Sequence, residues 1–340
     1  MQISQAALDI CHHSDIIDLH LDIWIPKRLF GYNPDAKHRS AWFGRHFFGH
    51  SDLPRMKEAG YTGAMWSITT NPIKLSNARW QSFLDNLFAL EQFCDEQDDV
   101  WLCRSHTDYL YAREHNKHAV FPAVQGANAI SGAPDGVASL PENHGVSRMT
   151  LVHLTPSVYG NTSSPAHIIH SNKGLTQAGK ELVESMNSAR IFVDLAHIRP
   201  EGFWDAVDVH DPNLPILVTH TGVQGVTPHW RNLDDDQIRA IAKSGGVVGV
   251  IFATNFLKHS GKKDASIIVD HLEHLINIGG EDIAAIGTDF DGAISAPTDL
   301  KTVNQFPVLV EHMLQRGWNE TRIRSVLGMN FLRVLKDWKP

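Results

Sequence analysis

Short apolar runs alternate along this chain with longer segments in which apolar residues recur at helical spacing. Many of the runs are almost continuously apolar, which is typical of strands in a parallel sheet whose two faces are both covered. The pattern predicts eight strands, at 15–22, 62–69, 118–125, 147–154, 190–197, 215–220, 246–252 and 283–289.

The segments between these runs are predicted as helices. Apolar residues share one helical face over 268–276, and Gly279-Gly280 would end that helix. The segment from Asp234 to Lys243 has acidic residues in its first turn, where they stabilise a helix. Two further helices are expected over 175–190 and after Asn319, which can cap the last helix of the chain.

Eight strands interleaved with helices predict an α/β fold, either a closed (β/α)8 barrel of the TIM type or a doubly wound open sheet. Polar residues end the first, fifth, sixth and eighth predicted strands. A closed ring brings these four strand ends together, whereas an open sheet would spread them over several strand spacings of ~4.8 Å each. We therefore expect a barrel that forms a single domain over residues 1–340.

The first predicted strand is followed by a long insertion, residues 23–57. A loop of this length inside a compact domain is usually functional. The insertion would form a lid over one end of the barrel, bury a contact with a second subunit in a homodimer, or simply pack against the barrel. Its aromatic and basic residues are Trp24, Lys27, Arg28, Phe30, Tyr32, Arg39, Trp42, Phe43, Arg45, Phe47 and Phe48.

The composition, 42% hydrophobic and 20% charged, is that of an ordinary globular protein. The net charge of −8 argues against a nucleic-acid partner, for which a basic surface is expected. No apolar run reaches the about 18 residues that a membrane-spanning helix needs, so we expect no membrane partner. The three cysteines lack metal-binding spacing and are expected to be free thiols, and we expect a cytoplasmic protein without a signal peptide.

The most informative pair of residues is His20 and Asp22, which close the first predicted strand. Residues i and i+2 of a strand point to the same face, so this imidazole and this carboxylate should converge. Three other predicted strands end in His197, His220 and Asp289. Together the five residues suit one or two divalent cations of the zinc type, which would activate a water molecule at neutral pH. Each of them alone is equally compatible with a structural role in the core or in a turn.

Ordered motifs along most of the chain resemble those of the membrane dipeptidase (renal dipeptidase) family of metallopeptidases, within the amidohydrolase-like barrel enzymes. Residues 18–22 resemble the family's D-G-H-N-D, and residues 147–153 resemble its R-Y-M-T-L-T-H, although Ser147 and Arg148 replace the leading Arg and Tyr. Further similar segments are Gly174-Leu175-Thr176, Val193-Asp194-Leu195-Ala196-His197, Thr219-His220-Thr221, Arg231-Asn232-Leu233-Asp234-Asp235 and Thr288-Asp289-Phe290-Asp291-Gly292.

The resemblance implies a metal site with two positions, most simply for zinc. His20 and Asp22 would bind the first ion, and His197 and His220 would bind the second. Gln125 stands where the family has a Glu that bridges the two ions. An amide carries no charge and offers only its oxygen as a good ligand, so the repulsion between two ions would be compensated less. We therefore expect weaker binding at one position, and the second is the doubtful one.

The resemblance also implies three residues that act on the substrate. Asp289 would accept the proton of the attacking water and deliver it to the leaving amine. His153 would stabilise the oxygen of the tetrahedral intermediate. Arg231 would bind the terminal carboxylate of the substrate through its planar guanidinium group.

Three functions remain open from the sequence. The first is a metal-dependent hydrolase that cleaves dipeptides or similar small amides with a free C-terminal carboxylate. The second is a catalytically weak or silent relative that binds a small peptide-like ligand, and the third is a mononuclear hydrolase of another amide or ester. The last two follow from the loss of the bridging carboxylate at Gln125.

Overall fold

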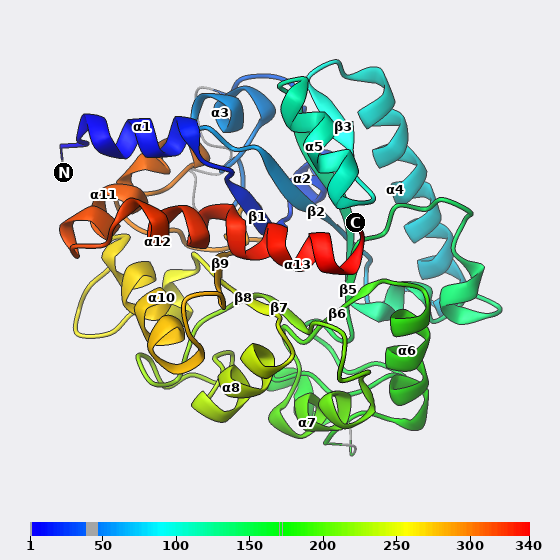
Figure 1. The fold of residues 1–340 in the computed structure, drawn as a ribbon. Helices are drawn as coiled ribbons and strands as arrows, with labels where there is room; N and C mark the ends of the chain where they lie inside the picture. The colour runs from blue at the N-terminus through cyan, green and yellow to red at the C-terminus, as the bar shows by residue number, and fades with distance from the viewer. Residues whose placement is uncertain (1, 39–46, 170, 172) are drawn as a thin grey trace.

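The computed structural model describes residues 2–38, 47–169, 171 and 173–340. Eight parallel strands close into a ring surrounded by helices, the (β/α)8 barrel that the sequence predicts (Figure 1). The ring is closed because β2 pairs with β1 on one side and directly with β4 on the other, while β1 also pairs with β9. The eight strands are β1 (Ile17–Leu21), β2 (Gly63–Thr69), β4 (His118–Gln125), β5 (Arg148–Thr150), β6 (Phe192–Asp194), β7 (Leu217–Thr221), β8 (Val247–Val250) and β9 (Ala284–Ile286).

All eight predicted strands are confirmed, although several are shorter than predicted. A ninth strand, β3 (Val100–Leu102), is absent from the prediction. It pairs in parallel with the first residues of β4, while β5 pairs with the same strand further along, at Ala123. Three residues are too few to show a periodic pattern, so this strand is defined by its partner rather than by its own sequence.

Helices occupy the segments between the strands and form the outer layer of the barrel in Figure 1. Short 3-10 turns lie at Ala127–Ile130, Gly136–Ser139, Pro165–Ile169 and Val303–Gln305. The α-helices are α1 (Gln5–His13), α2 (Trp24–Phe30), α3 (Leu53–Glu58), α4 (Ser76–Glu96), α5 (His106–Glu114), α6 (Gln177–Ser188), α7 (Pro200–Val209), α8 (Asp235–Lys243), α9 (Thr254–Leu257), α10 (Ser266–Gly279), α11 (Pro307–Gln315), α12 (Glu320–Arg324) and α13 (Asn330–Trp338).

Capping residues explain where the predicted helices begin and end. At α8, the Asp234 side chain accepts a hydrogen bond from the Gln237 backbone amide, and the Gln237 side-chain oxygen accepts one from the Asp234 backbone amide, which is a complete capping box. Gly280, with φ 91°, ends α10. The Asn319 side chain caps α12 by accepting from the Arg322 amide at 2.9 Å. The helices predicted over these segments are confirmed.

The N-terminal half of the barrel interior is filled by apolar side chains and covered by α13, which passes across the strands in Figure 1. The Phe331 ring lies 5.9 Å from that of Phe121, and Trp338 stacks on Phe192 at 4.8 Å. This packing leaves the C-terminal ends of the strands as the place where polar side chains can gather. The strand residues of this core are Ile17, Leu19, Met65, Ala119, Phe121, Ala123, Phe192, Leu217, Val247 and Ala285.

The described part of the insertion 23–57 is tied to the rim where β9 ends. The carboxylate of Asp291 accepts hydrogen bonds from the backbone amides of Gly49 at 2.6 Å, His50 at 2.9 Å and Ser51 at 3.1 Å. Four residues of the sequence analysis lie outside the described residues: Arg39, Trp42, Phe43 and Arg45. The contact places this segment over the same end of the barrel as the polar strand ends.

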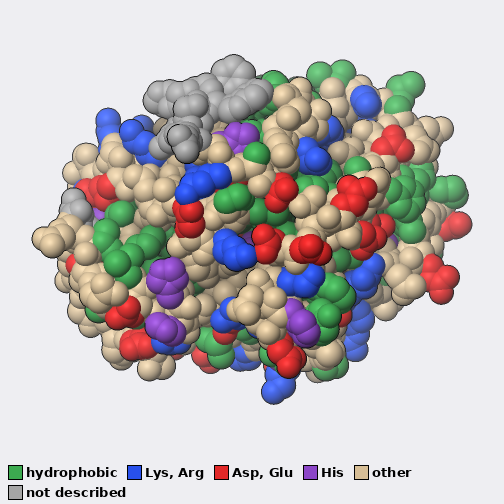
Figure 2. All heavy atoms as spheres, turned by 90° about the horizontal axis from the view of Figure 1, so that it is seen from above, with side chains coloured by type: hydrophobic (Ala, Val, Ile, Leu, Met, Phe, Trp, Pro, Cys, Tyr) green, Lys and Arg blue, Asp and Glu red, His purple; other side chains and the backbone are tan. Residues whose placement is uncertain are grey.

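Surface and thiol properties follow the composition. Cys11, Cys94 and Cys103 are buried free thiols, as predicted. Among the helices of the described residues, none is both long and apolar enough to cross a membrane. Basic and acidic side chains are interspersed on the face that Figure 2 shows, in line with a modest net negative charge.

Gly287 offers a test of the barrel's packing. It follows β9 so close to β7 that an added Cβ atom would lie 1.7 Å from the Thr219 carbonyl oxygen. We predict that Gly287→Ala lowers the free energy of unfolding in urea by about 3 kcal/mol or more, because two backbones would have to separate. The control Gly31→Ala adds the same methyl group where no atom lies within 4 Å, and should cost only about 1 kcal/mol for its left-handed backbone. Equal losses would contradict this account.

Candidate metal centre

The predicted site residues lie together at the C-terminal ends of the barrel strands. In TIM barrels this is the end that carries active sites. The strands contribute His20 in β1, Asp22 after it, Gln125 at the end of β4, His153 after β5, His197 after β6, His220 in β7, Arg231 before α8 and Asp289 after β9.

Irregular pairing in two strands helps to place two of the histidines. The register between β1 and β2 shifts between Asp18 and Leu21, and His20 lies within that shift. The register between β7 and β8 shifts between Val218 and Thr221, around His220. A bulge turns the local backbone and redirects a side chain away from regular alternation. The irregular register at both histidines depends on the neighbouring strand, so the sequence does not reveal it.

The imidazoles of His197 and His220 face each other, with their Nε2 atoms 2.7 Å apart. Thr219 Oγ1 donates its only proton to Asp194 Oδ2 at 2.6 Å, so it must accept from His220 Nδ1 at 2.9 Å. His220 Nδ1 therefore carries the proton, and Nε2 presents a free lone pair toward His197. A hydrogen bond to the remote nitrogen is the usual way to orient a metal-binding histidine. This pair fits a divalent cation of the zinc type.

His20 lies on the carboxylate side of the same cluster. Its Nε2 is 3.4 Å from Asp22 Oδ2 and 3.5 Å from Asp289 Oδ1. Its ring centroid is 3.6 Å from that of His220. Ligand atoms of His20, His220 and Asp289 all lie within 4.8 Å of one another. The fold thus brings together residues that are far apart in the chain, as the barrel prediction requires.

Burial decides the protonation of the imidazoles. It lowers the pKa of His20, His197 and His220 well below the usual value, and the nearby Arg148 and Arg231 guanidinium groups act in the same direction. It also lowers the pKa of His153 to about 4. Neutral imidazoles are the form that binds a metal ion.

The two carboxylates of the centre are hydrogen-bonded to each other. Burial raises the pKa of Asp22 to about 7. Burial and, next, the charge of Asp22 raise the pKa of Asp289 well above its usual range. The pair therefore shares a proton when no cation is near, and binding of a divalent cation would release it.

Gln125 is buried beside the same cluster. Its Oε1 accepts a hydrogen bond from Thr69 Oγ1 at 2.9 Å, so the one good ligand atom of the amide already has a donor. Its side chain also forms a hydrogen bond with His20 that raises the imidazole pKa, whereas burial lowers it. Gln125 thus lies in the centre but brings no negative charge to it.

A cavity of about 370 Å³ opens on this centre. Such a volume is within the usual range for small-molecule sites, and its mixture of apolar walls and a few polar groups is typical of them. Its polar lining comes from Asp22, Gln125, His153, His197, Arg231, Asn255, Asp289 and Ser295. Apolar walls come from both the insertion and the barrel loops: Ile25, Phe48, Leu154, Trp230, Phe256 and Ile294.

Arg231 and His153 lie beside the two histidines that could bind a cation, His220 and His197. Arg231 Nη2 donates to the His220 backbone oxygen at 2.5 Å, and its Nε has no partner among the described residues. Burial lowers the pKa of Arg231 to about 10, against the charges of Asp289 and Asp194, so it stays charged at neutral pH. The His153 ring meets that of His197 edge-on at 4.7 Å.

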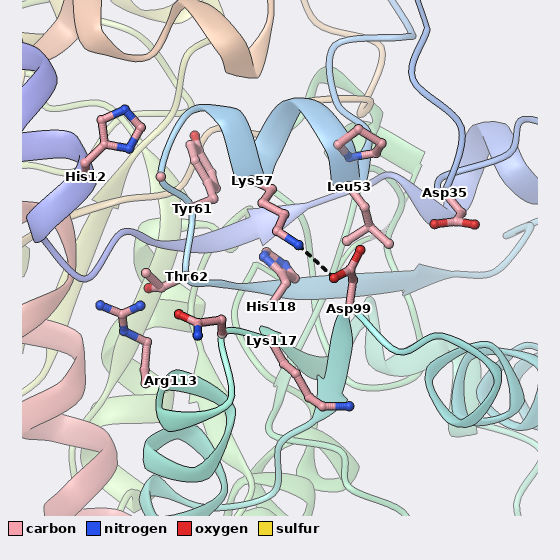
Figure 3. Close-up of a pocket in the computed structure, with 13 residues that line it drawn as sticks. His12, Asp35, Leu53, Lys57, Tyr61, Thr62, Asp99, Arg113, Lys117 and His118 are labelled. Atoms are coloured by element: carbon pink, nitrogen blue, oxygen red, sulfur yellow. Dashed lines mark hydrogen bonds and ion pairs between the residues drawn. The ribbon is translucent and has the colours of Figure 1, made fainter.

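A second cavity, of about 200 Å³, lies at the opposite end of the barrel, where β2 and β4 begin (Figure 3). Its lining includes an ion pair of Lys57 and Asp99 at 2.8 Å, whose side chains are more than half exposed. The N-terminal face of a TIM barrel contributes to stability rather than to catalysis. The polar cluster at the C-terminal end is therefore the candidate site.

Sequence reasoning gave no role to several buried polar residues beside the centre. Asp18 accepts hydrogen bonds from the Thr288 amide at 2.9 Å and hydroxyl at 2.6 Å, which mirrors the bond between Thr219 and Asp194. Each of these bonds ties neighbouring strands together just below a candidate ligand. The signal in the sequence is an Asp two or three residues before a ligand candidate. Arg148, in contrast, stands out in the sequence only as a departure from the family motif.

Local backbone conformation at the centre is unusual. His197 has φ 67° and Asp289 has φ 60°, and Asp291 and Ala293 are also left-handed. Such residues cost about 1–3 kcal/mol each and tend to cluster at functional sites. The strain supports the assignment of this rim as the functional end.

A comparison with protein families matches residues 4–339 to the membrane dipeptidase family, peptidase family M19. An uncharacterized protein in the pqqA 5' region of Klebsiella pneumoniae is 33% identical over 248 residues, which cover 69% of this chain and 88% of that protein.

Two solved structures share the fold at somewhat lower identity. Dipeptidase AC, a metallopeptidase of family M19, is 28% identical with a TM-score of 0.82 over 96% of this chain and 99% of its own. A metallopeptidase of Rhodobacter sphaeroides, bound to a phosphinate mimic of the dipeptide L-Ala-D-Ala, is 26% identical with a TM-score of 0.80 over the same shares of the two chains. The match over nearly the whole chain shows that this protein belongs to the membrane dipeptidase family of metallopeptidases.

Proposed function

We propose that this chain is a zinc-dependent hydrolase that cleaves dipeptides or similar small amides with a free C-terminal carboxylate. The observation that carries the proposal is that one cavity is lined by His197, Asp289 and Arg231. One small substrate could therefore reach a histidine suited to bind a metal ion, a carboxylate suited to transfer a proton and a guanidinium suited to bind a carboxylate. The relative that binds a mimic of L-Ala-D-Ala supports the choice of a dipeptide.

The histidine pair would hold the cation. His197 and His220 are neutral because of burial, and the hydrogen bond that His220 Nδ1 donates to Thr219 leaves His220 Nε2 able to ligate. Bound zinc lowers the pKa of a water molecule so that it is a nucleophile at neutral pH. Any substrate amide must then lie in the 370 Å³ cavity beside this pair.

Proton transfer is assigned to Asp289. Its carboxylate lines the cavity and is held against Asp22, and burial next to that second carboxylate raises its pKa. A carboxylate of raised basicity is suited to accept the proton of the attacking water and to donate it to the leaving nitrogen. The neutral imidazole of His153 would donate a hydrogen bond to the carbonyl oxygen as negative charge develops on it.

Substrate orientation is assigned to Arg231. Its guanidinium is charged and buried, and among the described residues it donates to one acceptor, the His220 backbone oxygen. The remaining donors can bind a carboxylate in two parallel hydrogen bonds. The apolar walls near Trp230 and Phe256 suit an apolar substrate side chain.

We further propose that the insertion 23–57 is a lid on a single barrel domain. We also propose that the protein is cytoplasmic and that it assembles as a homodimer.

A second function is favoured by one observation, the amide of Gln125 in the place of the family's bridging carboxylate. A centre with less negative charge would hold fewer ions and turn over slowly or not at all. The chain would then bind a small peptide-like ligand without hydrolysing it, or act as a mononuclear hydrolase of another amide or ester.

The first test is hydrolysis itself. With added zinc, the protein should release amino acids from members of a dipeptide library, and a chelator should abolish the activity. His220→Ala should lower kcat/KM by at least about 100-fold, because it removes a ligand of the activating ion. The exposed His13→Ala is a matched control and should keep full activity. Thermal stabilisation by dipeptides without any turnover would instead support the binding protein.

The second test concerns carboxylate recognition by Arg231. We predict that Arg231→Met raises KM for a dipeptide by about 10- to 100-fold, because a charge-assisted hydrogen bond is worth about 1.5–3 kcal/mol. The same dipeptide with an amidated C-terminus should be hydrolysed poorly by the wild type and be little affected by the substitution. An equal loss on both substrates would contradict a role in carboxylate binding.

The third test concerns the carboxylate pair. An added Cβ at Gly292 would lie 2.3 Å from Asp289 Oδ1 and 2.7 Å from Asp22 Oδ2. We predict that Gly292→Ala pushes the pair apart and lowers zinc affinity and kcat/KM by about 10-fold or more. Calorimetric zinc titration measures the first effect. The control Gly261→Ala, whose Cβ meets nothing within 4 Å, should leave both values unchanged.

A further inference from the structure

Arg148, the first residue of β5, is wholly buried beneath the candidate metal centre. Its Nη2 donates to His20 Nδ1 at 2.5 Å and to Ser67 Oγ at 2.6 Å. Its Nη1 donates to the Val124 carbonyl oxygen at 3.2 Å and lies 3.3 Å from Asp194 Oδ2. The guanidinium is thus held from several strands at once, with one of its donors directed at a predicted metal ligand.

This contact determines which nitrogen of His20 carries the proton. A guanidinium group has donors but no acceptor, so His20 Nδ1 must accept the hydrogen bond from Arg148. The proton of the neutral imidazole is then on Nε2, the atom that faces Asp22 and Asp289 at 3.4 and 3.5 Å. A nitrogen that carries a proton has no lone pair for a metal ion.

His220 has the opposite arrangement. Its Nδ1 donates to Thr219, so its Nε2 is free to ligate. The two halves of the centre therefore differ. His220 Nε2 keeps its lone pair, and His197 Nδ1 has no partner among the described residues, so the His197 proton can move there and leave Nε2 for a cation. Arg148, in contrast, holds the proton of His20 on Nε2, the atom that faces the carboxylates.

The charge of the centre points in the same direction. Relative to the family motifs that the sequence resembles, Gln125 replaces a Glu, from −1 to 0, and Arg148 replaces a Tyr, from 0 to +1. The two differences add up to +2, which is the charge of one divalent cation. Buried positive charges are costly unless they are compensated, and a second ion at His20 would compete with Arg148 for the charges of Asp22 and Asp289.

We propose that the Arg148 guanidinium takes the place of the cation at His20, so that this chain holds a single metal ion, at His197 and His220. This inference rests on the proposed function, because it concerns the same centre. It differs from the expectation from sequence, which treated the second position as the doubtful one. Arg148 is in this view a positioning residue for His20 and a fixed substitute for an ion.

The first experiment measures cobalt and zinc bound per chain by elemental analysis and by the cobalt absorption spectrum. The wild type should retain one equivalent. The double variant Arg148→Tyr with Gln125→Glu should retain two, with the affinity for the second ion increased by about 10- to 100-fold. Gln125→Glu alone should gain much less, because His20 Nδ1 still accepts from Arg148.

A charge-matched control separates the contact with His20 from a general change in charge. Arg28, on α2, interacts electrostatically with Asp22 and donates to the Thr69 carbonyl oxygen. Arg28→Met also removes a positive charge near the centre but leaves His20 untouched, so it should still bind one equivalent. Two equivalents in Arg28→Met, or in Gln125→Glu alone, would overturn the role given to Arg148.

The second experiment uses the wild-type background and keeps the inference testable if the Arg148 variants do not fold. His20→Ala should retain its single cobalt ion with a nearly unchanged spectrum, whereas His220→Ala should lose it. The reverse result, or two ions of similar affinity in the wild type, would overturn the inference. Two ions together with dipeptide hydrolysis would leave the proposed function intact, while the absence of any bound ion in all variants would remove the proposed function as well.

Discussion

The burial of histidine, carboxylate and guanidinium groups in one polar layer of the barrel is the constraint on which the rest of this structure depends. Each isolated charge in such a layer would cost several kcal/mol. The imidazoles of His20, His197 and His220 are therefore neutral, Asp22 and Asp289 share a proton, and Arg148 lies against Asp194. The hydrogen-bond partners of these groups, more than their identities, set what each of them can bind.

The barrel supplies this layer by separating its two ends. Apolar residues and α13 fill the N-terminal half, and the cavity that reaches the polar layer opens where the strands end. The strand register is irregular around His20 and His220, and the backbone is left-handed at His197 and Asp289. Strain of this kind persists only because the surrounding packing holds it.

Family membership and the departures from the family motifs act on different parts of the centre. The bond from Thr219 to Asp194 and the orientation of His220 build one half in a form suited to a metal ion. Gln125 and Arg148 alter the other half. Gln125 by itself removes one negative charge from the ligands of the centre. Together with the buried guanidinium of Arg148, it makes the site more positive than the family motifs imply.

The sequence by itself determined the barrel and the residues that gather at its rim, because continuous apolar strands and the polar residues that end them are local patterns. Runs such as 62–69 and 118–125 correspond closely to β2 and β4, and His20, Asp22, His197, His220 and Asp289 converge as their strand ends predict. The three residues of β3 and the irregular register in β1 and β7 could not be predicted from the sequence, since both depend on a neighbouring strand. Only the tertiary structure decided that Arg148 donates to His20 and that Thr219 donates to Asp194, which leaves Thr219 to accept from His220. The first two contacts join different strands, and a hydrogen bond between residues distant in the chain leaves no pattern in the sequence of either one.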